Sequence, residues 1–234
     1  MYKFTKPKRQ YFDRGRYEEK KMILKGKKAV FLGDSITEGI AASSSEKCYV
    51  SLFAKNEEVV VFNYGVGGTR IARQSNPNTS DPRDDDFIMR SDRMAPDADI
   101  VVVFGGTNDY GHGDAPFGTE EDETAFTFCG ACNVLFEKLN NQFPRAVKLA
   151  LTPLGRDGEE KPPAGKRPLC EYAAAVKFAA EKHGWFVLDL YAMCKTDPAI
   201  AQVRRQLADG LHPDDLGHAL LAGKIAEFLK GIPE

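Results

Sequence analysis

Short apolar runs recur along the chain, and longer mixed segments separate them. Five runs are rich in β-branched or other large apolar residues and do not alternate with polar positions: 29–32, 59–62, 100–104, 147–151 and 185–188. Such runs are typical of parallel strands that are buried on both faces of a sheet. The pattern therefore predicts five strands in one parallel sheet.

The segments between these runs are long enough for crossover helices. The clearest helical segments are at about 120–142, 168–182 and 214–230. Alternating strands and helices favour a parallel sheet with helices on both faces. Because neither a repeat nor a break in composition divides the chain, we predict a single α/β domain over residues 28–234.

Two polar loops interrupt this alternation. Residues 73–86 contain Pro and end in three acids, and residues 155–168 are rich in Gly and Pro. Long loops at strand ends commonly carry binding function, so we expect both to form walls of a pocket. We interpret the acids at 84–86 as solvated residues rather than as a cation site.

Basic residues are concentrated at the start of the chain. Residues 1–28 hold 11 Lys or Arg against 3 Asp or Glu, whereas the whole chain has a net charge of -2. We predict a basic arm over residues 1–27, which is either solvated or docks on a neighbouring subunit of a homo-oligomer. The near-neutral total charge favours neither a nucleic-acid partner nor a membrane partner.

Targeting signals and cysteine usage suggest a compartment. The basic start is not followed by the apolar stretch of a secretory signal, and no run approaches the roughly 18 apolar residues of a membrane span. The chain has 5 cysteines without framework spacing, which predicts free thiols and a cytoplasmic location. We interpret Cys129 and Cys132, inside the predicted helix at 120–142, as buried small residues rather than as a redox or metal motif.

Residues that could take part in catalysis follow the predicted strands. Ligands of parallel α/β sheets bind beyond the carboxyl ends of the strands. Ser35 follows the first run, glycines at 65–68 follow the second, and Asn108 follows the third; Asp209 and His212 lie just before the last predicted helix. Together they provide a hydroxyl, a backbone amide open to close approach, a carboxamide and an Asp-His pair, which is the set needed for acyl transfer.

Each of these residues also has a purely structural interpretation. Ser35 with Glu38 matches a capping box, so Ser35 is a candidate helix cap as well as a candidate nucleophile. The glycines at 65–68 suit turns that need positive φ, and 106–109 is ordinary turn chemistry.

Four blocks in order resemble the SGNH hydrolases, also called the GDSL-type esterase and lipase superfamily. The blocks are 33–35, Gly68, 106–109 and 209–212. After Ser35 the chain has Ile36 in place of the Leu of the family's name, a variation familiar in the carbohydrate-directed branches. The resemblance implies a three-layer α/β/α, flavodoxin-like fold with a five-stranded parallel sheet, and a serine esterase that uses neither a metal nor an organic cofactor.

The resemblance also assigns roles to residues. It implies that Ser35 is the nucleophile, His212 its general base, and Asp209 the acid that orients the imidazole. The oxyanion donors it implies are the backbone N–H groups of Ser35 and Gly68 and the side-chain amide of Asn108.

The remaining polar residues of these blocks receive weaker assignments. We expect Asp34 to brace the turn before Ser35 and Asp109 to hold its own loop. Asp34 and His112 are also candidates for substrate contact, the latter because it lies in a Gly-rich loop.

The loop composition predicts the substrate class. Few large apolar residues occur in the loops at 73–86 and 110–123, which favours short acyl groups such as acetyl on a carbohydrate or another small polar alcohol. The alternatives are a thioesterase or lysophospholipase of the same superfamily, or a catalytically silent member that binds acylated glycans.

Overall fold

The computed structural model describes residues 21–75, 77 and 80–233. A five-stranded parallel sheet with the order β2-β1-β3-β4-β5 forms its centre. The strands are β1 (Lys28–Gly33), β2 (Val60–Gly65), β3 (Ile100–Phe104), β4 (Val147–Leu151) and β5 (Phe186–Leu188). The predicted parallel sheet of five strands is therefore confirmed.

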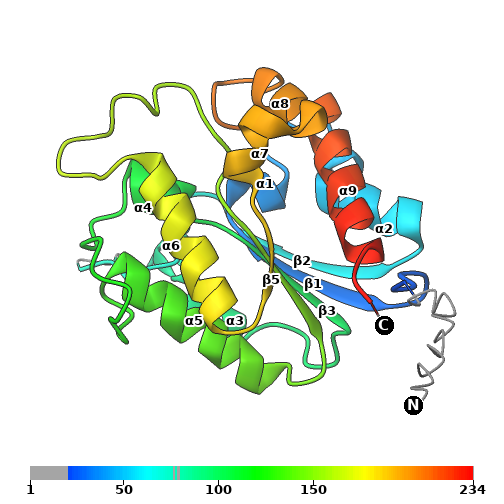
Figure 1. Cartoon of the computed structure of the whole chain (residues 1–234), viewed down its shortest axis with the longest axis horizontal. Helices are drawn as coiled ribbons and strands as arrows, with labels where there is room; N and C mark the ends of the chain where they lie inside the picture. The colour runs from blue at the N-terminus through cyan, green and yellow to red at the C-terminus, as the bar shows by residue number, and fades with distance from the viewer. Residues whose placement is uncertain (1–20, 76, 78–79, 234) are drawn as a thin grey trace, which may run out of the picture.

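Helices cover both faces of the sheet, as Figure 1 shows. They are α1 (Ser35–Glu38), α2 (Tyr49–Glu57), α3 (Phe87–Ser91), α4 (Thr107–Gly111), α5 (Phe128–Gln142), α6 (Leu169–Lys182), α7 (Leu190–Thr196), α8 (Pro198–Arg205) and α9 (Asp215–Lys230), with single 3-10 turns at η1 (Ser45–Lys47) and η2 (Pro82–Asp84). One layer holds α2 and α9, and the other holds α5 and α6, so the three-layer α/β/α prediction is confirmed. Within the described ranges, no helix is both long enough and apolar enough to span a bilayer.

The central strands explain why their sequences are apolar without alternation. Along β1, Phe31 packs into the core beneath α2 and α9, while Val30 and Leu32 pack into the core beneath α5 and α6. Successive side chains of a strand point to opposite faces, so a strand covered on both faces needs an apolar residue at every position.

The two edge strands depart from the predicted burial. Val60 and Phe62 of β2 are 51% and 39% exposed, and Phe186 of β5 is 43% exposed. The prediction that these strands are buried on both faces was wrong, because an edge position leaves part of each strand in solvent even when its residues are apolar.

Helix α5 begins later than predicted. The Thr127 side chain accepts a hydrogen bond from the backbone N–H of Gly130 and caps the helix, so residues 120–126 form turns instead. Cys129 and Cys132 consequently lie within the first five residues of the helix. Both are buried, and burial raises the pKa of each thiol, that of Cys129 to about 11, which agrees with their interpretation as buried small residues.

Most of the predicted basic arm lies outside the described residues. Its last part packs on the domain: Met22 and Leu24 are buried in the core beside α9, and the Met22 backbone N–H donates to the Ile232 carbonyl over 3.0 Å. Residues 21–22 therefore contact the C-terminal segment of the chain.

Candidate active site

The turn from β1 into α1 sets the position of Ser35. A Cβ at Gly33 would overlap the Thr37 side chain, so only glycine allows the helix to begin so close to the strand. The Asp34 carboxylate caps α1 by accepting the Ile36 N–H over 3.1 Å, and Ser35 is the first residue of the helix. The interpretation of Ser35 as the helix cap was wrong, because Asp34 occupies that position and leaves the Ser35 hydroxyl for other partners.

Ser35, His212 and Asp209 form one hydrogen-bonded chain. The Ser35 Oγ lies 2.8 Å from His212 Nε2, and His212 Nδ1 lies 2.7 Å from Asp209 Oδ2. The other carboxylate oxygen of Asp209 accepts the backbone N–H groups of Leu211 and His212 over 3.0 and 2.8 Å. The three-residue spacing thus closes a turn in which one carboxylate holds both the loop and the imidazole.

The ionisation of Asp209 follows from these contacts. Burial alone would raise its pKa, but the hydrogen bonds from the His212 side chain and from the two backbone N–H groups lower the pKa of Asp209 to about 2. The carboxylate accepts the proton of Nδ1, which turns the lone pair of His212 Nε2 toward the Ser35 hydroxyl.

The loop that carries Asp209 and His212 is itself fixed. The Ala208 N–H donates to the His212 carbonyl over 2.8 Å, and the Asp214 N–H donates to the Gln206 carbonyl over 2.7 Å. From the predicted wall loop at 155–168, the Asp157 N–H donates to the Gly210 carbonyl over 2.8 Å. The two segments are therefore in contact beside the triad.

The segment that contains Gly67 and Gly68 lies between Ser35 and Asn108. A Cβ at Gly67 would stand 3.6 Å from the Ser35 Cβ, and the Asn108 side-chain amide donates to the Thr69 carbonyl over 3.0 Å. Gly68 has φ of +78°, a conformation that favours glycine, and a Cβ there would meet only the Arg83 side chain at 4.0 Å. The three predicted oxyanion donors therefore come from adjacent segments.

The orientation of the Asn108 amide is fixed by its partners. Because the Thr69 carbonyl can only accept, the Asn108 nitrogen must face it, and the Asn108 oxygen then faces His112 Nε2 at 3.2 Å. His112 must carry its proton on Nε2 to complete this contact. His112 thus lies behind Asn108, whereas His218 sits in the core, where its Nδ1 accepts the Tyr49 N–H.

Two buried carboxyls support the loops behind Ser35 and Asn108. Asp109 accepts the N–H groups of Ile71 and Ala72 over 3.0 and 2.9 Å, as expected of a residue that holds its loop. Burial raises the pKa of Asp34 to about 7 and that of Asp109 to about 6. Asp34 is 2% exposed and engaged in capping α1, a geometry that fits bracing rather than substrate contact.

Arg90 is a supporting residue that the sequence analysis missed. It is buried and donates to the Gly33 carbonyl over 3.1 Å, to the Thr69 hydroxyl over 2.8 Å and to the Tyr64 carbonyl. Its guanidinium ties the end of β1 to the segment after β2. The available signal was a single cation directly after the three apolar residues that begin α3.

The acids at 84–86 are not simply solvated, and that prediction was wrong. Asp84 pairs with Arg70, Asp85 pairs with Arg93, and Asp86 pairs with Arg73. Asp86 is only 1% exposed, and it also caps α3 through the Met89 N–H. These pairs fasten the loop to the domain. Within the described part of the chain, no group of three or more His, Cys, Asp or Glu could hold a metal ion.

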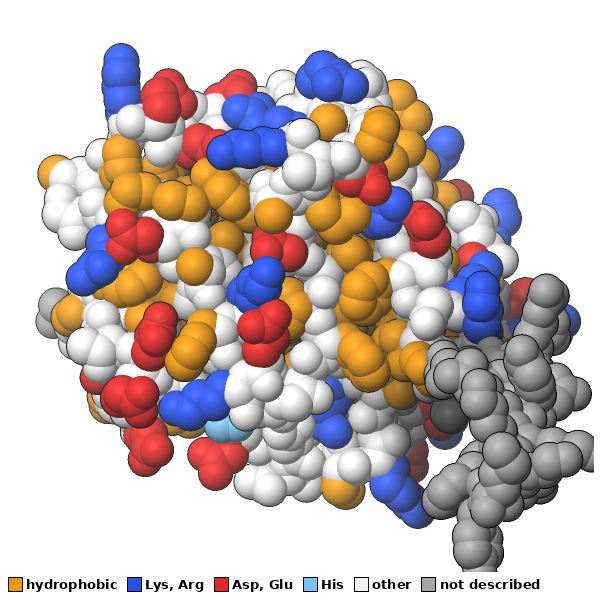
Figure 2. All heavy atoms as spheres, viewed as in Figure 1, with side chains coloured by type: hydrophobic (Ala, Val, Ile, Leu, Met, Phe, Trp, Pro, Cys, Tyr) orange, Lys and Arg blue, Asp and Glu red, His pale blue; other side chains and the backbone are white. Residues whose placement is uncertain are grey.

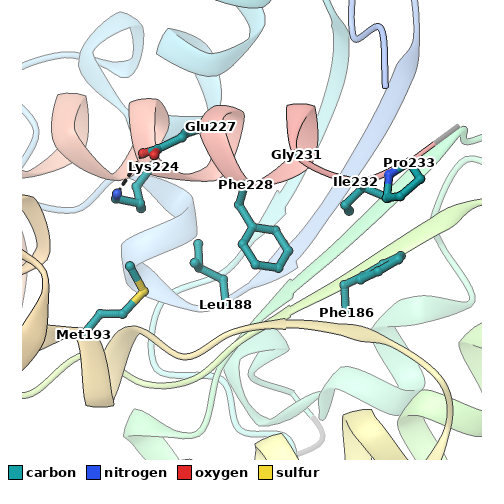
Figure 3. Close-up of a pocket in the computed structure, with 9 residues that line it drawn as sticks. All are labelled: Phe186, Leu188, Met193, Lys224, Glu227, Phe228, Gly231, Ile232 and Pro233. Atoms are coloured by element: carbon teal, nitrogen blue, oxygen red, sulfur yellow. Dashed lines mark hydrogen bonds and ion pairs between the residues drawn. The ribbon is translucent and has the colours of Figure 1, made fainter. Parts of the chain in front are cut away.

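A large groove lies away from the triad. It has a volume of about 460 Å³ between β5, α7 and α9, and Figure 3 shows apolar side chains facing into it. Figure 2 shows apolar side chains exposed on this face of the molecule. The lining residues are Phe186, Leu188, Met193, Lys224, Glu227, Phe228, Gly231, Ile232 and Pro233. None of the predicted site residues contributes to it.

Comparison with known proteins decides the family. The profile of the GDSL-like lipase/acylhydrolase family matches residues 31–220, a range that includes every block described above. The chain belongs to this family. It is therefore a hydrolase of the SGNH superfamily that acts on esters.

Solved structures of similar proteins share the fold of this chain. A protein from Lactobacillus plantarum is 30% identical, with a TM-score of 0.73 over 87% of this chain and 96% of that one. The lipase/acylhydrolase from Enterococcus faecalis is 23% identical, with a TM-score of 0.60 over 89% of this chain and 98% of that one. At this lower identity the likeness shows the shared fold. Among curated proteins, none matches the chain.

The buried Asp34 predicts a pH-dependent difference in stability. Its folded pKa of about 7 lies above the ordinary value of 3.8, so ionisation destabilises the folded protein progressively as pH rises between these values. Asp34→Asn cannot ionise and can still accept the Ile36 N–H. The melting temperature of the variant minus that of the wild type should therefore be more positive at pH 8 than at pH 5. An identical difference at both pH values would contradict the raised pKa.

Proposed function

We propose that this hydrolase is a serine esterase that removes short acyl groups, chiefly acetyl, from a carbohydrate or another small polar alcohol. The hydrogen-bonded chain from Ser35 through His212 to Asp209, with contacts of 2.8 and 2.7 Å, carries the proposal. A serine hydroxyl needs a base within this range to become an effective nucleophile.

In the first half of the reaction, His212 Nε2 takes the proton of Ser35 as its Oγ attacks the ester carbonyl carbon. The tetrahedral intermediate then collapses, the bond to the alcohol breaks, and the imidazolium returns the proton to the departing oxygen. Asp209 stays ionised and stabilises the imidazolium. Water, activated by His212, then attacks the acyl group on Ser35 and releases the acid.

The negative charge on the former carbonyl oxygen needs donors. The proposed donors are the N–H groups of Ser35 and Gly68 and the Asn108 Nδ2. The Ser35 N–H is the first of helix α1 and has no acceptor within the helix. The loss of one such donor typically costs about 10² to 10³ in kcat.

His112 acts in this scheme as a positioning residue. Its contact with the Asn108 oxygen and the contact of the Asn108 nitrogen with Thr69 hold the amide from both ends. Burial, and then the neighbouring cations Arg70, Arg156 and Lys166, lower the pKa of His112. The ring therefore stays neutral and donates from Nε2.

The preference for short acyl groups rests on the surroundings of the triad. The groove that could take a long alkyl chain is lined by residues of β5, α7 and α9 and by none of the triad or oxyanion residues. The loops that contact the site instead bring polar residues such as Arg156 and Asp157.

Hydrolysis of p-nitrophenyl esters from C2 to C12, alongside acetylated sugars, tests this proposal. The rate should be highest for C2 to C4 and should not change with EDTA, because no step uses a metal. A preference for C10 or longer chains would instead favour a lipase or lysophospholipase, and loss of activity on chelation would contradict the mechanism.

Asn108→Ala separates a catalytic role from a structural one. As an oxyanion donor, Asn108 meets full negative charge only in the tetrahedral state, so kcat should fall about 10² to 10³ while KM changes much less. The melting temperature should remain near that of the wild type. A lowered melting temperature with kcat within threefold of wild type would contradict the donor role.

The Asn108→Ala variant also tests the positioning role of His112. If His112 acts through Asn108, then His112→Ala should lower kcat in the wild type but have little further effect in Asn108→Ala. Equal effects in both backgrounds would show that His112 acts independently of the amide.

A further inference from the structure

The loop at 155–168, between β4 and α6, joins the two sides of the site (Figure 1). Its Asp157 contacts Gly210, the neighbour of Asp209, through the 2.8 Å backbone hydrogen bond. Its Arg156 reaches Thr107, the neighbour of Asn108, and Nη1 lies 3.4 Å from the Thr107 carbonyl and 3.3 Å from its hydroxyl. Arg156 therefore lies between the triad loop and the helix of the oxyanion amide.

The guanidinium of Arg156 is held in place by neutral partners. It stands over the Tyr110 ring at 5.7 Å, and its acceptors are the two oxygen atoms of Thr107. The next residue, Asp157, pairs with Arg204 at 2.7 Å. Glu159 uses its carboxylate to accept the Arg156 backbone N–H over 2.9 Å and contacts the Tyr191 hydroxyl at 3.5 Å. Among the residues that the structure describes, no carboxylate oxygen lies within 4.0 Å of the Arg156 guanidinium.

Apart from Arg90, which is buried and donates to the Gly33, Thr69 and Tyr64 oxygens, the other arginines beside the site pair with acids. Arg70 pairs with Asp84, and Arg83 pairs with Asp81 at 2.6 Å. At the far end of the same loop, Arg167 pairs with Glu171 at 2.9 Å. Arg156 is thus a partly buried cation without an acidic partner in the described residues, at the point where the two sides of the site meet.

Lys166 adds a second positive charge to this wall. Its Nζ donates to the Asp109 carbonyl over 2.9 Å and to the Gly113 carbonyl. Burial, and then Arg70, Arg156 and Lys166, lower the pKa of His112, so these cations lie near the residue behind Asn108. A positive wall of this kind favours an anionic ligand.

We propose that Arg156 binds a negatively charged group of the substrate, a carboxylate or a phosphate, beside the ester that Ser35 attacks. The guanidinium fork matches both groups and can donate two parallel hydrogen bonds. Thr107 engages Nη1, and in the described structure Nε and Nη2 have no protein acceptor, so they are the donors for this ligand. The inference rests on the proposed function, because it places the anion on the acyl ester that the triad cleaves.

Three aryl acetates test the inference: 4-acetoxybenzoate, 4-acetoxyphenyl phosphate and the neutral methyl 4-acetoxybenzoate. Each is assayed with wild type, Arg156→Gln, Arg156→Lys and the control Arg167→Gln. The readout is the change that each substitution causes on each ester, because the leaving groups differ in intrinsic reactivity. The two charged esters distinguish a carboxylate from a phosphate preference.

Arg156→Gln should lower kcat/KM at least tenfold on one or both charged esters, mainly through a higher KM, and less than twofold on the neutral ester. Arg156→Lys keeps the charge but loses the two-pronged guanidinium, so its kcat/KM on the charged esters should lie between those of the wild type and Arg156→Gln. Arg167→Gln should leave all three values within twofold, since Glu171 already neutralises that cation. Equal losses on all three esters with Arg156→Gln would overturn the inference, as would no loss on any.

Binding of inorganic phosphate gives a readout that does not depend on turnover. At constant ionic strength, phosphate should raise the melting temperature of the wild type and of Arg167→Gln but not of Arg156→Gln. If the wild type hydrolysed none of the esters, the proposed function would fail, and this measurement would still decide whether Arg156 binds an anion. Equal stabilisation of all three proteins would overturn the inference.

Discussion

The site depends on the steric constraint at the corner between β1 and α1. Gly33 lets α1 begin immediately after the strand, and this places Ser35 directly at its carboxyl end. Because β1 lies between β2 and β3, the segments that follow those strands reach the same point and bring Gly68 and Asn108. The last contribution comes from the opposite end of the chain, where the turn closed by Asp209 delivers His212 to the Ser35 hydroxyl.

Buried charges hold these segments in register at a cost in stability. Arg90 gathers acceptors from the end of β1 and the segment after β2, and Asp109 gathers two backbone N–H groups from residues 71–72. Burial lowers the pKa of Arg90 to about 10 and raises that of Asp109 to about 6, so each charged form is disfavoured by its environment. A polar network of this kind stabilises one arrangement of the loops because an unpaired member would be costly.

The pattern of apolar and polar residues predicted the features that depend on residues close together in the sequence. The apolar runs predicted β1 and β3 well because both faces of each are buried, but the same rule failed for Val60 and Phe186, since a run does not show which strand lies at the edge. The order of the four blocks predicted Ser35, Gly68, Asn108, Asp209 and His212 as site residues, and the fold joins Ser35, His212 and Asp209 in one hydrogen-bonded chain. Arg90 and Arg156 escaped notice because their partners lie far away in sequence, and only the fold shows which cations have acidic partners.

The central claim is that Ser35 is the nucleophile activated by His212, and covalent labelling tests it most directly. The protein is incubated with a fluorophosphonate probe, its intact mass is measured, and the modified peptide is mapped. We expect a single adduct on Ser35. It should form at least 100-fold more slowly in His212→Ala, because this variant lacks a general base that contributes about 10² to 10⁴ to the rate. An adduct on another residue, no adduct on the folded protein, or equally fast labelling of the variant would contradict it.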